Sequence, residues 1–253
     1  MTESIEATPL LVPSGGIPKL IDTKSLFEKA ISEIAAGSGP IAIDAERASG
    51  FRYSARAYLI QIKRNGGGLH LIDPIPLAGE KELIAKLNEL MEKNEVILHA
   101  ASQDLPCLRD WGLSPKKIFD TELGARLAGF PKVGLGSLIE EFFHKVLAKE
   151  HSAVDWSIRP LKEDWLAYAA LDVELMIELR DEIAKSLGNK IEWANQEFSA
   201  VLNAKPSAPK PDPWRRTSGM LKVRTREAMA IVRELWITRD KIASALDIAP
   251  GRL

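Results

Sequence analysis

Three apolar runs in the first third of the chain, followed by a helical crossover, constrain the fold more than any other feature of the sequence. The runs cover residues 40–46, 57–62 and 68–73. Asn65-Gly66-Gly67 lies between the second and third runs, and an Asn-Gly pair in that position favours a β-hairpin. The three runs therefore predict an antiparallel meander. A helical pattern over about 80–93 then leads to a fourth run at 96–100, and this crossover predicts a parallel fourth strand.

Helical periodicity dominates the following part of the chain up to residue 203. An amphipathic helix also precedes the first strand; it starts near Asp22-Thr23, which suit a helix N-terminus, and ends at Gly37–Gly39. Further helices are expected over residues 104–111, 121–128, 138–143, 162–187 and 190–202. Together the patterns predict an α/β protein in which helices flank a mixed sheet.

A proline-rich stretch divides the chain. Residues 204–213 contain four prolines, which remove backbone donors and cannot continue a helix. We therefore expect an irregular N-terminal segment over 1–19, a main domain over 20–203, a linker over 204–213 and a helical segment over 214–253. This last segment has too few apolar side chains for a core of its own, so it is either the start of a domain or a piece that docks on the main one.

The charge of the C-terminal segment bears on the expected partners. Residues 214–253 contain nine Lys or Arg and four Asp or Glu, a net charge of +5, whereas the whole chain has a net charge of −1. A basic segment beside an acidic body favours a nucleic-acid ligand. A solvated basic helix without a ligand has the same composition, so charge alone leaves both interpretations open.

Other features of the composition exclude several protein classes. The single cysteine, Cys107, cannot form an internal disulfide, and no Cys or His spacing typical of a zinc site lies near it. Residues 1–20 show no signal-peptide pattern, and no apolar stretch reaches the length of a membrane span. We therefore expect a cytoplasmic protein with no membrane partner.

Paired acidic residues supply the clearest chemical signal. The pattern Asp-x-Glu occurs three times, at Asp44/Glu46, Asp120/Glu122 and Asp172/Glu174. Residues two apart point to the same face of a strand but diverge by about 200° on a helix, and only the first pair lies in a predicted strand. Two carboxylates on one face of a central strand are costly unless a cation compensates them. The first pair is therefore a candidate metal site, and an exposed strand end is the alternative.

Other candidate residues follow later in the chain. Tyr168 and Asp172 are four residues apart, so one helix face carries a phenol and a carboxylate. Such a phenol can orient a water while the carboxylate holds a metal; a surface helix carrying both by chance is the alternative. Asp104 follows the fourth strand, where open sheets commonly place ligands, although it also suits a helix N-terminus. Asp120 is best interpreted as a helix N-cap and His99, taken alone, as a buried histidine.

These residues, in this order, resemble the three motifs of the DEDDy subgroup of DnaQ-like 3′-5′ exonucleases. The segments are Ile43-Asp44-Ala45-Glu46, His99-Ala-Ala-Ser-Gln-Asp104-Leu105, Phe119-Asp120-Thr121 and Tyr168-x-x-x-Asp172. Within that superfamily the chain is similar to ribonuclease D, as Asp155-Trp156-Ser-Ile-Arg159-Pro160-Leu161 also indicates. Ala48-Ser-Gly-Phe-Arg-Tyr-Ser54 is similar to actinobacterial members. One departure is Ala45, where the family often has Thr, and its side chain is expected to face away from the metals.

The resemblance covers about residues 20–203 and implies an RNase H-like exonuclease fold with a mixed sheet of about five strands flanked by helices. It implies a catalytic set of five residues: Asp44, Glu46, Asp104, Tyr168 and Asp172. The four carboxylates are implied to bind two Mg²⁺ or Mn²⁺ ions, and the tyrosine to position the attacking water. The implied activity is removal of nucleotides from single-stranded RNA 3′ ends, with tRNA precursors as expected substrates and a monomer as the expected state.

From Pro213-Trp214-Arg215-Arg216 onward the chain resembles the entry into the helical HRDC domain that follows the nuclease in this family, so the segment corresponds to a truncated HRDC domain. Two alternative functions stay open. The same fold can act as a DNA exonuclease, because the metal chemistry does not read the 2′-hydroxyl. A non-enzymatic RNA-binding scaffold is the other, and the intact carboxylate set argues against it because clustered acids repel one another without a metal.

Outside the carboxylate set, four residues are candidate contacts to nucleic acid: His99, Arg52, Trp156 and Arg159. Arg52 lies in a basic aromatic loop after the first strand, near the expected rim of the active site. Trp156 and Arg159 shortly precede the helix that carries Tyr168 and could stack on a base or bind the backbone. Core packing is the alternative for Trp156, and a structural ion pair is the alternative for Arg159.

Overall fold

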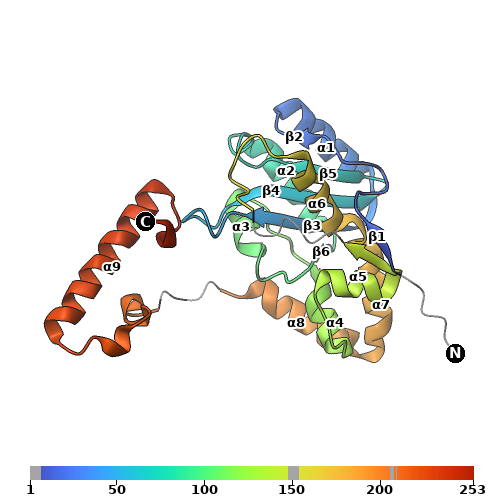
Figure 1. Cartoon of the computed structure of the whole chain (residues 1–253). Coiled ribbons are helices and arrows are strands. Elements are labelled where there is room, and N and C mark those ends of the chain that lie inside the picture. The colour runs from blue at the N-terminus through green and yellow to red at the C-terminus, as the bar shows by residue number, and fades with distance from the viewer. Residues whose placement is uncertain (1–6, 148–153, 206–207, 209) are drawn as a thin grey trace.

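The computed structural model describes residues 7–147, 154–205, 208 and 210–253, and its centre is a six-stranded mixed sheet (Figure 1). The strand order is β2 (Leu20–Ile21), β5 (Gly68–Ile72), β4 (Ala57–Asn65), β3 (Ser38–Arg47), β6 (Val96–Leu98) and β7 (Ile118–Asp120). β3, β4 and β5 form the predicted antiparallel meander, and β6 pairs parallel with β3. The predicted mixed sheet is confirmed, and the short strands β2 and β7 form its two edges.

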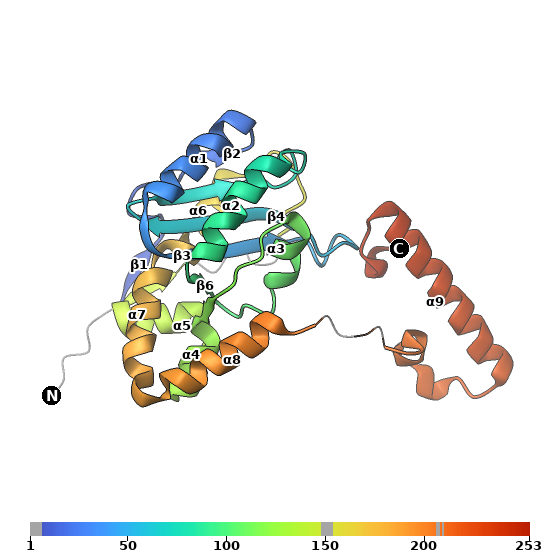
Figure 2. The same cartoon turned by 180° about the vertical axis from the view of Figure 1, so that it is seen from behind.

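Alternate residues of β3 face two different environments, because side chains along a strand point to opposite faces. Ile41, Ile43 and Ala45 belong to the main hydrophobic core. On this face lie α1 (Lys24–Ala36) and α2 (Lys81–Lys93), which Figure 2 shows in front of the sheet.

The opposite face of the sheet, which carries Asp44 and Glu46, is covered by two helices. These are α6 (Glu163–Glu174), which packs on β3, β4 and β5, and α7 (Met176–Leu187), which packs on β3 and β6. Ala42 and Ile97 of the sheet pack there against Val173 of α6 and Met176 of α7. The acidic side chains at the end of β3 therefore lie between the sheet and α6.

Further helices complete the part of the chain up to residue 203. They are α3 (Leu105–Trp111), α4 (Thr121–Ala128), α5 (Leu135–Phe143) and α8 (Ile191–Asn203). α4 packs against α7 and α8, and the rings of Phe119 and Phe198 join β7 to α8 with their centroids 4.8 Å apart. Short 3₁₀ helices cover Gly188–Lys190, Pro213–Arg216, Met220–Lys222 and Pro250–Arg252.

The helix predicted over 162–187 is two helices, because the chain breaks at Leu175 with φ −113° and ψ 12°. The Lys63 ammonium donates to the backbone carbonyl of Glu174, a group that a continuous helix would pair with its own backbone. α7 then starts with a bond from the Leu179 N–H to the Leu175 carbonyl. A side chain from the sheet therefore ends α6 just after Asp172.

The N-terminal segment is more ordered than the irregular structure expected over 1–19. Within it β1 (Thr8–Leu10) pairs parallel with β8 (Lys145–Leu147). The Ser14 N–H and hydroxyl both donate to Glu174 Oε1, at 3.0 and 2.6 Å. Residues 1–6 of that prediction lie outside the described residues. The segment is held by contacts with residues more than a hundred positions away, which local patterns do not reveal.

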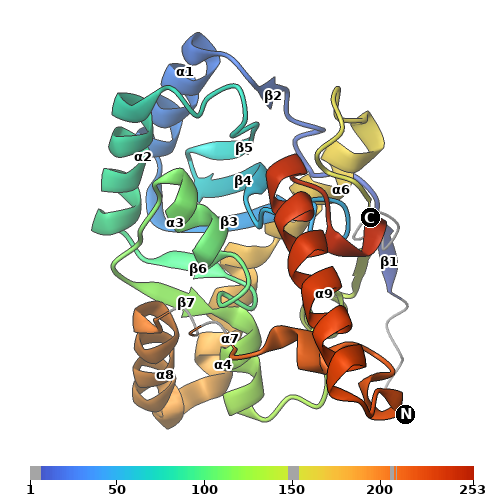
Figure 3. The same cartoon turned by 90° about the vertical axis from the view of Figure 1, so that its left-hand side faces the viewer.

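The C-terminal segment forms one long helix, α9 (Arg226–Leu246), that touches the main domain at the loop between β3 and β4 (Figures 1 and 3). Asp247 accepts a hydrogen bond from the Ser54 N–H at 2.8 Å, and the Ala249 N–H donates to the Phe51 carbonyl at 3.0 Å. The segment therefore docks on the loop that follows the acidic end of β3. Part of the expected linker, residues 206, 207 and 209, lies outside the described residues.

None of the helices in the described part of the chain combines the length and the apolar character needed to cross a bilayer.

Candidate active site

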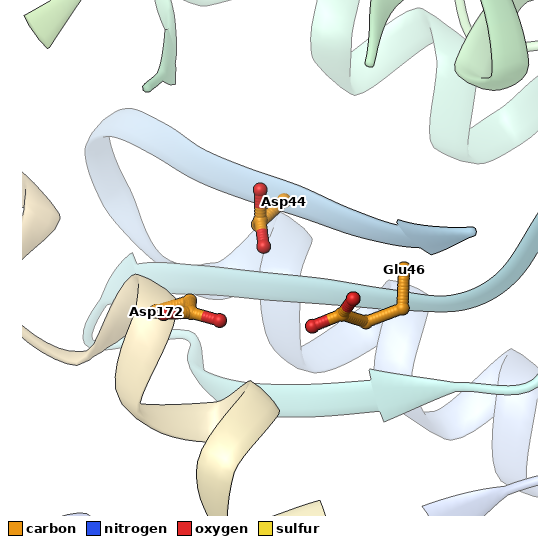
Figure 4. Close-up of side chains that lie close together, drawn as sticks. All are labelled: Asp44, Glu46 and Asp172. Carbon is orange, nitrogen blue, oxygen red and sulfur yellow. The ribbon is translucent and has the colours of Figure 1, made fainter. Parts of the chain in front are cut away.

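Two strand residues and one helix residue converge at the acidic end of β3. Asp44 and Glu46 share the face that α6 covers, and Asp172 approaches from α6 (Figure 4). One carboxylate oxygen from each lies within 4.8 Å of the others. The period of two along the strand thus places Asp44 and Glu46 together, as predicted, and the packing of α6 adds the third carboxylate.

A turn after β6 delivers the fourth predicted carboxylate, Asp104. It is buried, and the negative charge of Asp44 raises its pKa further after burial. Its Oδ1 lies 3.7 Å from Nε of Arg47, which is a cationic neighbour at the end of β3. Asp104 therefore lies beside Asp44 and Arg47, next to the cluster formed by Asp44, Glu46 and Asp172.

Asp120 supports that turn and does not take part in the cluster itself. Its two carboxylate oxygens accept hydrogen bonds from the N–H groups of Ala100 and Ala101, at 3.1 and 2.8 Å. It also accepts from the Leu123 N–H at 3.1 Å, which confirms the N-cap prediction. The bonds to the turn before Asp104 were not foreseen, because they join residues that are about 20 positions apart in the sequence.

Burial raises the pKa of all four carboxyl groups of the site, because removing a charge from water is costly. The pKa of Asp104 rises to about 8, first through burial and then through the charge of Asp44. For Glu46, burial and then the charges of Asp44, Asp172 and Asp104 raise the pKa well above its ordinary value. The cluster therefore retains protons at pH values where isolated carboxyls are ionised, unless a cation neutralises it.

Tyr168 lies one turn before Asp172 on α6, on the side of the carboxylates. Burial, then the charges of Asp172, Glu46 and Asp44, raise the pKa of its phenol. The hydroxyl therefore stays protonated at neutral pH and can donate a hydrogen bond. The structure places the predicted phenol and carboxylate together at the site.

The donor set fits divalent cations that prefer oxygen ligands. The four acidic side chains offer carboxylate oxygens only, which suit Mg²⁺ and Mn²⁺ better than zinc or copper. Each cation would offset the cost of burying these charges together with their mutual repulsion, and four carboxylates are enough to hold two such ions in a phosphodiester-cleaving site. The chemistry of the residues present therefore agrees with the two divalent ions that the sequence implies.

The structure corrects two of the predicted nucleic-acid contacts. Trp156 has no exposed surface and packs edge-on against Trp165, with ring centroids 5.6 Å apart, so it cannot stack on a base. Arg159 forms a two-point ion pair with Asp73 through Nε–Oδ2 at 2.6 Å and Nη2–Oδ1 at 2.9 Å. It also donates to backbone carbonyls, among them that of Tyr58 at 2.7 Å. Both residues hold the segment before α6 against the sheet.

The other two predicted contacts stay predictions. His99 is half-buried, its Nδ1 lies 2.9 Å from the Thr121 hydroxyl, and burial lowers its pKa. Arg52 donates from Nε to the Ser157 hydroxyl at 2.7 Å and remains partly exposed. A cleft of about 260 Å³ opens beside Glu46 and is lined by residues 45–51 and Val154. The loop that carries Arg52 therefore lies next to the carboxylates.

A family model for the 3′-5′ exonuclease matches residues 18–188. The chain belongs to the 3′-5′ exonuclease family. The carboxylates on β3 and α6 and the mixed sheet that carries them all lie within that match. The match spans the predicted main domain up to the end of α7.

Curated relatives of this exonuclease include ribonuclease D from Psychromonas ingrahamii, which is 28% identical over 200 residues, covering 78% of this chain and 53% of the relative. The exosome complex exonuclease RRP6 from Saccharomyces cerevisiae is 28% identical over 255 residues, covering 92% of this chain and 34% of the relative. The chain thus spans about half the length, or less, of these two relatives.

Solved structures share the fold of this exonuclease. A protein from Bifidobacterium adolescentis has 44% sequence identity and a TM-score of 0.93, over 97% of this chain and 60% of that one. Escherichia coli RNase D has 27% identity and a TM-score of 0.69, over 92% of this chain and 62% of that one. The predicted similarity to ribonuclease D and the exonuclease fold are confirmed.

Proposed function

We propose that this member of the 3′-5′ exonuclease family is an exoribonuclease that removes nucleotides from RNA 3′ ends with the help of two divalent ions. The observation that supports it most directly is the convergence of Asp44, Glu46 and Asp172 within 4.8 Å. The name of the relative ribonuclease D supports RNA as the substrate. The proposed nuclease domain covers residues 20–203.

In this proposal Asp44, Glu46 and Asp172 hold the ions, and Asp104 completes the ligand set from the turn after β6. When bound, the ions supply an activated water and stabilise the leaving oxygen. Tyr168 donates its hydrogen bond to orient that water, and its raised pKa keeps the proton in place. The position of each of the five predicted residues is compatible with the role proposed for it.

The RNA 3′ end is proposed to enter the cleft beside Glu46. The loop with Arg52 forms one wall of that region, and residues 240–253 bind the same loop from outside. The basic residues 214–253 would then lie near the path of the RNA backbone. Escherichia coli RNase D is described as an exoribonuclease involved in structured RNA processing. We propose the same class of substrate, including tRNA precursors, for this chain. We also propose that the protein acts in the cytoplasm as a monomer.

The test is a time course with a single-stranded RNA labelled at its 5′ end, in Mg²⁺ or Mn²⁺, beside a DNA of matched sequence. Asp44→Asn and a sample with EDTA are the controls. We expect a ladder of products that shortens from the 3′ end in RNA and disappears in both controls. Equal or faster shortening of the DNA would replace the RNA substrate by DNA. No metal-dependent shortening of either strand would refute the nuclease proposal for this chain.

A further inference from the structure

A buried glutamine in the middle of the sheet has no hydrogen-bond partner among the described residues. Gln61 lies on β4 and has no exposed surface. Neither its Oε1 nor its Nε2 finds a donor or acceptor in the described part of the chain. Buried polar groups in native proteins are nearly always paired, so an unpaired primary amide at the centre of a sheet calls for a physical explanation.

The position of Gln61 relates it to the carboxylate cluster. In the register of β3 and β4, Gln61 is directly opposite Asp44, so the two side chains share one face of the sheet. Residues opposite each other on antiparallel strands have Cβ atoms about 4.5–5.5 Å apart. The glutamine side chain is long enough to span that separation, so its amide lies within reach of the Asp44 carboxylate.

The neighbours of Gln61 on β4 pack against α6, so the Gln61 side chain lies beneath the helix that carries Asp172. Two positions before Gln61, Leu59 packs with Trp165 and Ala169. Two positions after it, Lys63 contacts the carbonyl and the carboxylate of Glu174. Gln61 therefore faces the stretch of α6 that lies between these contacts, which includes Asp172.

The chemistry of the metal site explains why a neutral amide occupies position 61. An apolar residue of the same size would make a more stable sheet, because an unpaired buried amide loses its hydrogen bonds to water and gains none. A basic residue there would compete with a bound cation for the carboxylates. An amide N–H can instead hold a carboxylate in one orientation without neutralising it, as residues that support metal ligands commonly do.

We infer that Gln61 is a positioning residue of the metal site: its Nε2 donates to the carboxylate of Asp44 when that carboxylate holds a cation. The inference rests on the proposed metal site. In this role Gln61 lowers the stability of the metal-free protein and raises its affinity for divalent ions. These two effects have opposite signs, and a buried amide that only packs in the sheet would show the first effect without the gain in affinity.

The test replaces the amide by an apolar side chain of similar length, Gln61→Met, in the full chain. Leu71→Met is the matched control, because Leu71 is buried and lies opposite Gln61 on β5. Two quantities are measured for each protein: the thermal midpoint in EDTA, and the dissociation constant for Mn²⁺ by titration calorimetry. Neither readout depends on catalysis.

We expect Gln61→Met to melt at or above the wild-type temperature in EDTA and to bind Mn²⁺ roughly 10–100-fold more weakly. Leu71→Met should retain the wild-type affinity within about twofold. Gln61→Asn, which keeps the amide but shortens its reach, is expected to lose affinity as well. Wild-type affinity in Gln61→Met, or a lower midpoint of that variant in EDTA, would overturn the inference while leaving the metal site intact. A wild-type protein that takes up no Mn²⁺ would overturn the metal site and the inference together.

Discussion

Replacing Glu46 by glutamine is expected to stabilise the metal-free protein and to abolish its response to Mg²⁺. The substitution keeps the size of the side chain and removes one charge from a cluster of four carboxylates. Burial and the charges of Asp44, Asp172 and Asp104 all raise the pKa of Glu46, so its ionised form is unfavourable in the folded state. A neutral amide carries no such cost.

The magnitude follows from the geometry of the cluster. Two unit charges 4.8 Å apart, the upper limit for the ligand oxygens of Asp44, Glu46 and Asp172, repel by about 3.5 kcal/mol at an effective dielectric constant of about 20. Proton uptake relieves part of this repulsion near neutral pH, so we expect a gain of about 2 kcal/mol. For a protein of this size that corresponds to a rise of about 4–8 °C in melting temperature.

The sign of the pH dependence is fixed by the direction of the pKa shifts. Ordinary carboxyls titrate near pH 4, whereas the pKa of Asp104 is raised to about 8 and that of Glu46 well above its ordinary value. Between these limits the folded protein binds more protons than the unfolded chain, so these groups lower stability as the pH rises. The gain from Glu46→Gln should therefore be larger at about pH 8 than at about pH 5.5.

The assay is thermal unfolding followed by circular dichroism, in EDTA and in Mg²⁺, at both pH values. Wild type should gain stability from Mg²⁺, because a ligand of the native state stabilises it. The variant should not. The exposed acid Glu197, replaced by glutamine, is the matched control for the loss of one negative charge. A lower melting temperature of Glu46→Gln in EDTA at about pH 8 would refute the reasoning.

Four further outcomes are expected. Tyr168→Phe should lower kcat by roughly 100-fold and leave the Mg²⁺-induced rise in melting temperature unchanged; a kcat within twofold of wild type would exclude the proposed role. Arg159→Ala should lower the free energy of unfolding in urea by about 3 kcal/mol, because a buried aspartate loses its partner; a loss below about 1 kcal/mol would contradict the structural ion pair. Arg52→Ala should weaken RNA binding without changing the Mg²⁺ dependence, and unchanged affinity at low salt would count against it. Asp247→Ala should increase hydrogen exchange of the backbone over residues 50–56; wild-type protection there would show that the C-terminal segment does not hold this loop.

The residues that sequence reasoning placed correctly share a local cause. Asp44 and Glu46 lie together because the strand period is two, and Tyr168 and Asp172 lie together because a helix turn takes about four residues. The hairpin at Asn65-Gly66 follows from the turn residues themselves. Each of these relations is set within a few positions along the chain, so the sequence suffices to predict it.

The residues that it misassigned depend on contacts between distant segments. A tryptophan and an arginine before α6 look equally suited to a core or to a nucleic-acid surface. Only the position of Asp73 and of the sheet decides that Trp156 is buried and that Arg159 is engaged in an ion pair. The break at Leu175 has the same origin, because Lys63 reaches the helix from β4.

By itself, the sequence determined the meander, the crossover, the strand spacing of Asp44 and Glu46 and the helix spacing of Tyr168 and Asp172, since these follow from backbone periodicity and turn chemistry. The tertiary structure decided which carboxylates meet, that Asp120 also holds the turn before Asp104, and that the C-terminal segment rests on the loop beside Glu46. Those outcomes depend on which surfaces pack against each other, and packing is a property of the whole chain that no local pattern contains.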